Sequence, residues 1–358
     1  MQNKFKKVKE ALKEAIISGQ YSIGAKLPTE TELMAQYDVS RYTIRRAVGD
    51  LEEEHFINRI QGGGMFVQDW HREWTNDADS KVIGIITTHI ADYIFPSIIS
   101  GIDRVLSEKG YSILISNTHN DHEKERKSLI NMLDNKVAGL IIEPTQSALK
   151  NPNMDLYHEI QDDQIPTLFI NASYPELDFP VITNDDLEAE KEMVNYLFEL
   201  GHEAILGIFQ VGDLQGVHRM NGFIQAYQQQ PAIAYKSNLI MYQSGDSFEK
   251  VLKRVADYLQ GSEVPTAIVC YNDQLAIRVI DFLKSKGLKV PADISVVGFD
   301  DYQMSRYISP SLTTLNHNKT KMGEDAGQMV LDMIQDKPVE SILYQPALIN
   351  RDSAGKVK

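Results

Sequence analysis

The sequence has a single cysteine, Cys270, and lacks any long apolar run. One cysteine excludes an intrachain disulfide and a cysteine-based zinc site within the chain. The absence of an apolar stretch of about 18 residues or more excludes a transmembrane helix. Residues 1–7 are basic but no apolar stretch follows them, so a secretory signal peptide is not expected. These absences favour a protein without membrane contact in the cytoplasm.

Motifs that carry phosphate or metal chemistry are also missing. No predicted strand is followed by Gly-x-Gly-x-x-Gly, and there is no Gly-Lys-Ser/Thr phosphate loop. The His-Glu pairs at 122–123 and 202–203 have no second histidine at metal-binding spacing. An enzyme acting on carbohydrates or nucleotides stays open as an alternative, because Asp300 and Asp301 could serve acid–base chemistry. Turnover of candidate sugars would distinguish it. We predict no catalytic residue, no metal and no cofactor.

The charge of the chain is unevenly distributed. Its 358 residues, enough for two or three domains, carry a net charge of −14. Residues 1–70 hold ten basic and ten acidic residues, so the remaining 26 basic and 40 acidic residues account for the whole excess. The acidic residues after position 70 repel nucleic acid, whereas residues 1–70, which are neutral overall and contain clustered arginines, do not.

Residues 39–48 read as a basic helix. Ser40 is a suitable N-cap, since its hydroxyl can accept bonds from first-turn amides. The apolar residues at helical spacing are expected to face a core: Ile44, Ala47, Val48 and Leu51. Arg41 and Arg45 lie four residues apart on an adjacent strip. Arginines near the start of such a helix can pair with guanine in the major groove. The alternative is a solvated basic face on an ordinary helix.

The residues on either side of this basic helix predict a helix-turn-helix followed by a β-hairpin. Thr29 and Glu32 form a capping box for a short helix, and residues 38–40 link that helix to the basic one. Downstream, the strand-like runs 56–60 and 65–67 are joined by a glycine-rich tip. Glycines there permit positive φ and let the backbone approach a phosphate or the minor groove. The alternative for this tip is a flexible hairpin turn.

Residues 4–67 resemble the winged helix-turn-helix of the GntR family. The resemblance rests on the stretches 26–30, 39–47 and 61–67. It implies double-stranded operator DNA as a partner and nucleoid association. It also implies that Glu30, Arg41, Arg45 and the wing tip approach the DNA. With the neighbouring polar and basic residues, the predicted DNA-binding set is Lys4, Glu30, Arg41, Tyr42, Thr43, Arg45, Arg46, Gln61, Gly62 and Gly63.

Beyond a polar segment over 69–80, apolar runs alternate with helical segments. The strand-like runs are 82–86, 112–115, 139–142, 167–170, 205–209, 267–270 and 294–299, and helical segments include 98–109, 187–200 and 275–286. Continuous apolar character is typical of parallel strands buried on both faces. The alternation predicts doubly wound α/β sheets, arranged in two lobes.

Polar and aromatic residues follow these strands, at the ends where ligands bind in doubly wound sheets. Amides, carboxylates and a guanidinium can bond sugar hydroxyls, and aromatic faces can stack on the C–H surface of a sugar. Structural alternatives remain open. Asp273 could cap the next helix, Asn171 could form a cap or a turn before Pro175, and Asp301 could order the following loop.

Residues 81–350 resemble the effector domain of the LacI/GalR family, which has a periplasmic-sugar-binding-protein fold. The matching stretches include 219–223, 271–273 and 294–301. The resemblance implies that the residues matching Arg219, Asn272 and Asp300 contact a sugar, and that Asn171 and His317 often line the site. For His317 a surface position is an equal alternative. The full predicted effector set is Thr88, Tyr93, Phe95, Glu143, Asn171, Arg219, Asn272, Asp300 and His317.

Four further stretches are informative, namely 92–99, 143–145, 170–174 and 215–223. With them, the whole chain resembles the arabinose-repressor family of Gram-positive bacteria, in which a GntR-type head is fused to a LacI-type body. We therefore predict a winged helix-turn-helix domain over 1–68, a linker over 69–80 and a two-lobed effector and dimerisation domain over 81–355. The resemblance implies L-arabinose as the small-molecule partner, bound between the lobes of a homodimer and releasing it from DNA. A secreted binding protein is disfavoured by the head. A regulator answering to another sugar, an activator or a corepressor-dependent repressor stays open.

Overall fold

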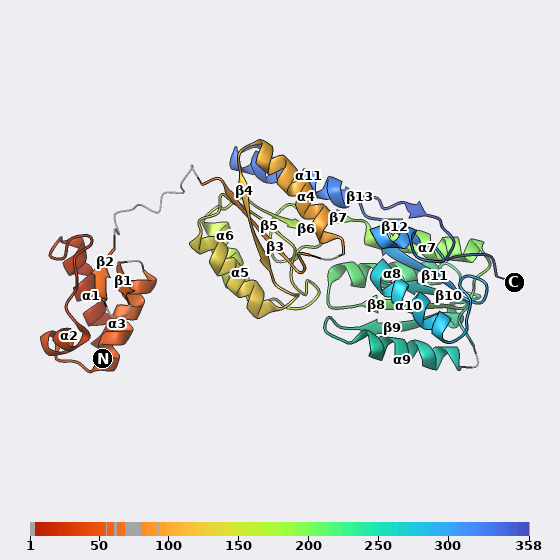
Figure 1. Ribbon diagram of the computed structural model, residues 1–358, viewed down its shortest axis with the longest axis horizontal. Coiled ribbons are helices and arrows are strands. Elements are labelled where there is room, and N and C mark those ends of the chain that lie inside the picture. The colour runs from red at the N-terminus through yellow and green to blue at the C-terminus, as the bar shows by residue number, and fades with distance from the viewer. Residues whose placement is uncertain are drawn as a thin grey trace. The chain divides into compact units, whose positions relative to one another are not determined.

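The chain divides into two compact units, residues 1–78 and residues 79–358 (Figure 1). The computed structural model describes residues 4–54, 56–60, 63–68, 80–91, 93–261 and 263–357. Apart from Ser80, the predicted linker lies outside the described residues. We call the first unit the head and the second unit the body, and describe each by itself.

The head is a three-helix unit with a two-stranded hairpin. Its elements are α1 (Lys4–Ile17), α2 (Glu30–Tyr37), α3 (Arg41–Glu53), β1 (Ile57–Ile60) and β2 (Gly64–Val67). The apolar residues predicted for α3 are fully buried, together with Leu12 of α1 and Leu33 of α2. The predicted apolar face of the basic helix is thus confirmed as the centre of the head's core.

Local hydrogen bonds fix where α2 and α3 begin. The Thr29 hydroxyl accepts from the Glu32 amide at 3.3 Å, and the Glu32 carboxylate accepts from the Thr29 amide at 2.7 Å, which is the predicted capping box. Ser40 caps α3 by accepting from the Thr43 amide at 3.3 Å. Asp38, with φ of 50°, ends α2 in a left-handed conformation, so the turn between the helices needs only three residues.

The hairpin forms the predicted wing. Strands β1 and β2 pair antiparallel with Ile57 opposite Val67 and Ile60 opposite Gly64. Gly64 has φ of 115°, a conformation that favours glycine, and a Cβ there would lie 2.6 Å from Cε of Lys26. The absence of a Cβ at Gly64 therefore leaves room for the Lys26 side chain beside the start of β2.

The body consists of two doubly wound lobes (Figure 1). Lobe 1 comprises β3 (Val82–Thr87), α4 (Phe95–Glu108), β4 (Ser112–Asn117), α5 (His122–Asp134), β5 (Gly139–Ile142), α6 (Met154–Asp162), β6 (Thr167–Ile170), β7 (Val181–Asn184), α11 (Lys319–Ile334) and β13 (Ile342–Tyr344). Lobe 2 comprises α7 (Asp186–Glu199), β8 (Ile205–Gln210), α8 (Leu214–Gln228), η1 (Ala234–Lys236), β9 (Asn238–Tyr242), α9 (Phe248–Leu259), β10 (Ala267–Cys270), α10 (Asp273–Ser285), β11 (Ser295–Asp300), η2 (Gln303–Arg306), β12 (Thr313–Asn316) and β14 (Leu348–Ile349).

Each lobe has a six-stranded sheet. The order is β13-β7-β6-β5-β3-β4 in lobe 1, all parallel, and β14-β12-β11-β10-β8-β9 in lobe 2, where only β14 is antiparallel. All seven predicted strands are confirmed. Strands β7, β9, β12, β13 and β14 were not predicted, because they are short or partly exposed: Met241 of β9 is 49% exposed and Leu343 of β13 is 58% exposed.

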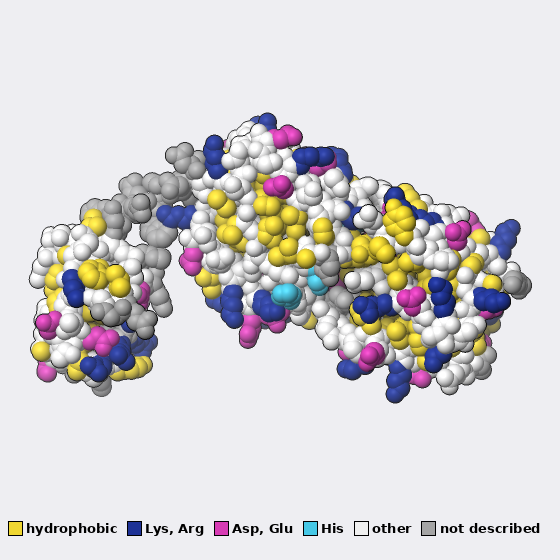
Figure 2. All heavy atoms as spheres, in the orientation of Figure 1, with side chains coloured by type: hydrophobic (Ala, Val, Ile, Leu, Met, Phe, Trp, Pro, Cys, Tyr) yellow, Lys and Arg dark blue, Asp and Glu magenta, His cyan; other side chains and the backbone are white. Residues whose placement is uncertain are grey.

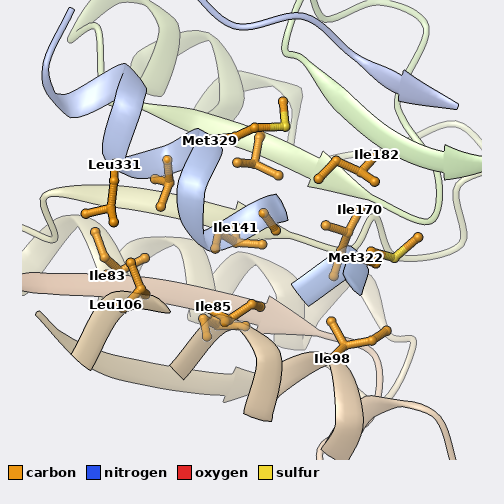
Figure 3. Packing of buried hydrophobic residues seen from close by; sticks show 14 of the residues in the cluster. Ile83, Ile85, Ile98, Leu106, Ile141, Ile170, Ile182, Met322, Met329 and Leu331 are labelled. Carbon is orange, nitrogen blue, oxygen red and sulfur yellow. The ribbon is translucent and has the colours of Figure 1, made fainter. Parts of the chain in front are cut away.

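Helices α4 and α11 cover one face of the lobe 1 sheet. Figure 3 shows Ile98 and Leu106 of α4 and Met322, Met329 and Leu331 of α11 packed against isoleucines of the strands. The two helices touch through their backbones, since a Cβ on Gly101 or Gly323 would collide with a carbonyl of the other helix. Residues separated by more than 200 positions thereby form one layer.

The chain crosses between the lobes three times, after β7, after β12 and after β13. The sheets are built so that the carboxyl ends of their parallel strands carry the connecting loops that face the space between the lobes. Such ends are where doubly wound sheets bind ligands. Across the described ranges, no helix has the length and apolar character needed to traverse a membrane.

Candidate functional site

The head presents two arginines of α3 around one carboxylate. Arg45 Nε lies 3.0 Å from both carboxylate oxygens of Glu30, and Arg41 Nε lies 3.6 Å from one of them. Both arginine side chains are about 60% exposed, at 59% and 61%. Exposed guanidinium groups on a helix can donate to base edges and phosphates, and a carboxylate can accept from cytosine. The predicted residues Glu30, Arg41 and Arg45 therefore form one exposed cluster.

The other predicted head residues are more scattered. Tyr42 is 73% exposed, and the Thr43 hydroxyl lies 3.0 Å from that of Ser40. Arg46 does not join the cluster, because its guanidinium stacks 4.1 Å from the ring centre of Phe5 in α1. In the space-filling view, basic side chains of the head gather near its lower edge beside acidic ones (Figure 2). Gly63 is in the wing turn, whereas the Lys4 side chain, Gln61 and Gly62 lie outside the described part of the chain.

A polar cavity of about 270 Å³ lies between the two lobes of the body. All nine predicted effector residues line it. The cavity is near the small end of the range of roughly 300–1,000 Å³ that small-molecule sites span. Other residues that line the cavity were not in the predicted set, among them His89, Asn120, Asn184, Gln210, Asp213, Gln215, Tyr242 and Tyr271.

Lobe 1 contributes a buried carboxyl held by uncharged donors. Glu143 follows β5 and is 5% exposed. Its Oε2 accepts from the Thr88 amide at 3.0 Å and the Thr88 hydroxyl at 2.6 Å, and its Oε1 accepts from Asn171 Nδ2 at 2.9 Å. Burial raises the pKa of Glu143 to about 7, although these hydrogen bonds oppose the shift. The carboxyl therefore titrates closer to neutral pH than a solvent-exposed glutamate does.

Lobe 2 contributes a buried arginine between two carboxylates. Arg219 Nε donates to Asp186 Oδ1 at 2.8 Å, and its Nη2 lies 3.6 Å from Asp300 Oδ1. The guanidinium also donates to the Tyr271 carbonyl at 2.7 Å and lies 3.5 Å from the ring centre of Phe299. These contacts offset the cost of burying its charge and fix its direction.

The same arginine determines the charge of Asp300. Burial acts to raise the pKa of Asp300, but the charge of Arg219 and the bond with His317 lower it to about 2. For Asp186, burial outweighs the attraction of Arg219 and raises the pKa to about 6. At neutral pH, Asp300 is therefore ionised.

Tyr93 connects the two lobes at one end of the cavity. It precedes α4 of lobe 1, and its hydroxyl bonds the Asp300 carboxylate of lobe 2. The same hydroxyl lies 3.1 Å from the Phe299 carbonyl and accepts from the Asp273 amide at 3.2 Å. Further along, the Ser147 hydroxyl of lobe 1 accepts from the Leu214 amide at 2.9 Å. The lobes are thus hydrogen-bonded to each other at two separate points.

Three amide side chains of the lining have an oxygen without a hydrogen-bond partner among the described residues. They are Asn171 Oδ1, Asn184 Oδ1 and Gln215 Oε1. A buried acceptor without a partner is costly, and such groups in native proteins are usually matched by water or ligand. The cavity therefore offers acceptors to a ligand that carries several hydroxyl donors.

The charge balance of the lining disfavours anions. Arg219 is the single arginine or lysine of the described lining residues, and Asp186 and Asp300 already neutralise it. Asp213 and Asp246 add two further carboxyls to the lining beside Glu143 and Asp300, and burial raises the pKa of Asp213. A phosphorylated ligand would meet these carboxyls without a free cation to pair with.

The structural alternatives have different outcomes. Asp273 does not cap α10, because Asn272 is the N-cap of that helix. Asp273 is instead fully buried, and its carboxylate accepts from the Ser305 and Thr314 hydroxyls at 2.7 and 2.6 Å. Asp301 pairs with Arg351 and Arg306 and so orders the loop after β11. Asn272, though it lines the cavity, also caps α10 by accepting from the Leu275 amide at 2.9 Å. Asn171 adopts a turn conformation with φ of 65° and lines the cavity as well.

The missed lining residues also follow strand ends. Asn184 ends β7, Tyr242 ends β9, and Asp213 caps α8 shortly after β8. The same strand-end rule finds them once β7 and β9 are identified as strands. Within the described ranges, no group of three or more histidine, cysteine or acidic residues is arranged to hold a metal ion.

Comparison with known proteins matches both units. The family described as bacterial regulatory proteins, gntR family, matches residues 4–67, and a periplasmic binding protein-like domain matches residues 194–354. Solved LacI-type regulators share the fold of the body. One from Alkaliphilus metalliredigens, complexed with D-xylulofuranose, is 24% identical with a TM-score of 0.67, covering 77% of this chain and 99% of that one. Another from Enterococcus faecium, with bound ribose, is 23% identical with a TM-score of 0.67, covering 77% and 100%.

Curated relatives match along the entire length. The arabinose metabolism transcriptional repressor of Geobacillus stearothermophilus is 41% identical over 99% of this chain and 98% of its own. The protein of the same name from Halalkalibacterium halodurans is 37% identical over 100% and 98%. These relatives are regulators rather than enzymes. The chain, with its gntR-type head and LacI-type body, therefore belongs to the family of arabinose metabolism transcriptional repressors.

Proposed function

We propose that this protein is a homodimeric repressor of arabinose-utilisation genes that leaves its operator when L-arabinose binds between the lobes of the body. Because chromosomal DNA is its target, it acts in the cytoplasm. The head binds operator DNA and the body binds the sugar.

The observation that carries the proposal is the polar cavity between the lobes. Residues from both lobes line it, and they include the unpartnered oxygens of Asn171, Asn184 and Gln215. Each sugar hydroxyl can donate to one such oxygen and accept from a group such as Arg219 or Asn272. The aromatic rings of Tyr93 and Phe95 supply apolar surface for the C–H face of the ring. A small neutral polyol fits this chemistry.

The size and charge of the cavity support a pentose. About 270 Å³ favours a ligand with few heavy atoms. Among the lining residues that the structure describes, the only arginine or lysine is Arg219, which is already paired with carboxylates and so is not free to bind a phosphate. The names of the full-length relatives then favour L-arabinose among the neutral pentoses.

For DNA recognition we assign the direct contacts to the exposed cluster of Glu30, Arg41 and Arg45, with Tyr42 and Thr43 beside it. Arg46 and the wing residue Gly63 contribute backbone or phosphate contacts. One head covers one half-site, so a two-fold dimer brings two heads to a two-fold operator. Phosphate contacts make the binding depend steeply on salt.

Release follows from differential affinity. The sugar contacts both lobes at once, so it binds a closed body more tightly than an open one. Operator DNA prefers dimers whose bodies hold the heads at the half-site spacing, and closure disfavours that spacing. To move the population from about 1:99 to 99:1, the sugar must prefer one state by about 5.5 kcal/mol.

The test is direct sugar binding by the full-length protein. We would titrate it calorimetrically with L-arabinose, and with D-xylose, D-ribose and D-galactose as controls. We expect saturable binding of L-arabinose and much weaker binding of the other sugars. Preferred binding of another sugar would keep the cavity assignment and reject arabinose. Binding of none would reject the sugar site.

The role of the head is tested with duplex DNA from upstream of arabinose-utilisation genes. Arg41→Ala and Arg45→Ala are each expected to weaken binding by roughly 1–3 kcal/mol. The exposed Arg254→Ala, in the body, serves as the matched control. Equal operator affinity of all three variants and the wild type would reject the assignment of the cluster.

A further inference from the structure

A second buried carboxylate lies in lobe 1, behind the loops that carry Glu143 and Asn171. Glu125 of α5 is fully buried and none of the roles above uses it. Five groups donate to it, from loops and helices on several sides: the Thr145 amide at 3.3 Å, Asn151 Nδ2 at 2.9 Å, Asn153 Nδ2 at 2.9 Å, the Tyr157 hydroxyl at 2.9 Å and the Tyr174 hydroxyl at 2.8 Å. A buried carboxylate is retained only when such donors surround it.

One of these donors also touches the loop after β5. The Tyr174 hydroxyl lies 2.8 Å from Glu125 Oε1 and 2.8 Å from the Thr145 carbonyl. Its one proton is shared between two acceptors, so the hydroxyl bonds the loop after β6 to α5 and to the loop after β5. Tyr174 is 1% exposed, and its ring packs against Tyr157 and Phe169. Its position is therefore closely defined.

The two loops joined by Tyr174 supply the lobe 1 half of the cavity. Asn171 lies three residues before Tyr174, and Glu143 lies two residues before Thr145. At the cavity, Asn171 Nδ2 donates to Glu143 Oε1 at 2.9 Å. Two hydrogen bonds thus join the loops. One is the bond from Asn171 to Glu143 at the cavity surface, and the other is the bond between the Tyr174 hydroxyl and the Thr145 carbonyl, farther from the cavity.

The arrangement of Asn171 and Glu143 at the cavity depends on how the Tyr174 hydroxyl holds the two loops. Asn171 has φ of 65°, a left-handed conformation that surrounding structure must hold in a non-glycine residue. The loop after β5 also carries Ser147, whose hydroxyl accepts from the Leu214 amide of lobe 2 at 2.9 Å. A displacement of this loop moves both Glu143 and the contact with α8, the helix that carries Arg219.

We propose that Tyr174 is a positioning residue of the effector cavity: its hydroxyl, anchored on Glu125, holds the two loops so that Asn171 and Glu143 meet the sugar together. This inference rests on the proposed function, because it assigns to Tyr174 an effect on sugar binding. Tyr174 does not line the cavity and acts through the loops that do.

The chain contains a matched control for this hydroxyl. Tyr157 donates to the same Glu125 oxygen at 2.9 Å and is equally buried. It belongs to α6, and none of the described lining residues comes from that helix. Tyr174→Phe and Tyr157→Phe therefore remove the same group from the same acceptor, but only Tyr174→Phe also removes a bond between the two cavity loops.

The experiment compares the two variants with the wild-type full-length dimer. L-arabinose affinity by calorimetry is expected to fall roughly 3- to 10-fold in Tyr174→Phe and to change less than about twofold in Tyr157→Phe. Both variants are expected to unfold at a similarly lowered temperature, and both are expected to bind operator as the wild type does without sugar. An equal loss of sugar affinity in both variants, or none in Tyr174→Phe, overturns the proposal.

A second readout needs no sugar. Amide hydrogen exchange around residues 143–147 and 171–174 is expected to be faster in Tyr174→Phe than in Tyr157→Phe or the wild type. Equal exchange in the two variants overturns the positioning role. Failure of the wild type to bind L-arabinose rejects the proposed effector alone, and the exchange comparison then decides on Tyr174.

Discussion

The two lobes of the body each present a buried carboxyl to the same cavity, and the pKa values of these carboxyls shift in opposite directions. Glu143 of lobe 1 has its pKa raised by burial to about 7, whereas Asp300 of lobe 2 has its pKa lowered to about 2. Both are nearly inaccessible to solvent, at 5% and 3% exposure. The difference therefore lies in their partners rather than in their burial.

The partners of Glu143 are uncharged, and those of Asp300 include a guanidinium. Neutral donors from Thr88 and Asn171 reduce the cost of ionising Glu143 without removing it. Arg219, at 3.6 Å, supplies a positive charge that removes this cost for Asp300. The comparison teaches that one half of the cavity is permanently ionic, while the other half titrates close to neutral pH.

The strongest way to break this comparison is to remove the cation. In Arg219→Met, Asp186 and Asp300 lose their partner in a buried site, and we expect a loss of roughly 3–5 kcal/mol in the free energy of unfolding. Sugar affinity is expected to fall by more than about 100-fold, since an uncompensated charge and a lost donor combine. Calorimetry and denaturant unfolding measure the two effects.

The control for this change is Arg104→Met, since Arg104 is an exposed arginine of α4 that pairs with Glu324. We expect it to bind sugar normally. If Arg219→Met is too unstable to purify, Arg219→Lys keeps the charge but loses the planar donors, and reduced sugar affinity is still expected. Release of either Arg219 variant from operator at the wild-type sugar concentration would contradict the assignment.

A smaller change removes only the charge of the lobe 2 carboxyl. Asp300→Asn keeps the shape of the side chain, but it cannot accept from Tyr93, His317 and a sugar hydroxyl as a carboxylate does. We expect sugar affinity to fall roughly 10- to 100-fold, the range for hydrogen bonds to charged groups. The matched control is Asp301→Asn, whose side chain pairs with Arg351 away from the lining. Equal losses in the two variants would show that the effect is not specific to the cavity.

The corresponding change in lobe 1 is expected to have a smaller effect. Because burial raises the pKa of Glu143 to about 7, Glu143→Gln replaces a group that is partly neutral near pH 7. One amide oxygen can still accept from Thr88, and we expect sugar affinity at pH 7 to fall only roughly 2- to 5-fold. A loss as large as that of Asp300→Asn would contradict the proposed difference between the lobes.

The smallest expected effect is the dependence of sugar affinity on pH. Sugar hydroxyls that donate to Glu143 favour its ionised form, so binding lowers its pKa and releases protons. Affinity is then expected to rise by roughly 2- to 3-fold as the pH increases from about 6 to 8. Burial also raises the pKa values of other carboxyls, namely Asp186, Asp213, Glu190 and Asp273. The contribution of Glu143 is therefore obtained by subtracting the pH dependence of sugar affinity in Glu143→Gln from that of the wild type. Identical pH profiles of the two proteins would contradict the role of Glu143.

The same shifts have opposite consequences for stability. Between about 4.5 and 7 the folded protein holds the Glu143 proton more tightly than the unfolded chain does, so this group lowers stability as the pH rises through that window. Asp300 contributes stability that is present above about 3.8 and is lost as the pH falls toward about 2. Urea unfolding of Glu143→Gln should accordingly show a weaker loss of stability between pH 5 and 8 than the wild type.

Sequence reasoning worked where the determining contacts are local. The cap at Ser40, the capping box at Thr29 and the buried face of α3 depend on residues at most a few turns apart. Continuous apolar runs identify the buried parallel strands, and the residues that follow these strands lie at the same edge of the sheet. This is why all nine predicted effector residues line the cavity although they span residues 88 to 317.

Sequence reasoning failed where position depends on the partner strand or on distant packing. Asn184 was missed because β7, four residues long and half-buried, has no apolar run. Arg46 is exposed, but its guanidinium stacks on Phe5 of α1, a contact between two helices that no local pattern indicates. The bonds from Tyr157 and Tyr174 to Glu125 span 32 and 49 residues, and no local pattern indicates them.

The most direct test of the account is release from operator by sugar. The full-length wild type and Asp300→Asn would be bound to a labelled operator fragment at fixed salt and titrated with L-arabinose, with fluorescence anisotropy as the readout. The account predicts that both bind DNA equally without sugar, that L-arabinose releases the wild type, and that Asp300→Asn needs roughly 10- to 100-fold more sugar for release. Release of both proteins at the same sugar concentration, or wild-type binding that L-arabinose leaves unchanged, would contradict it.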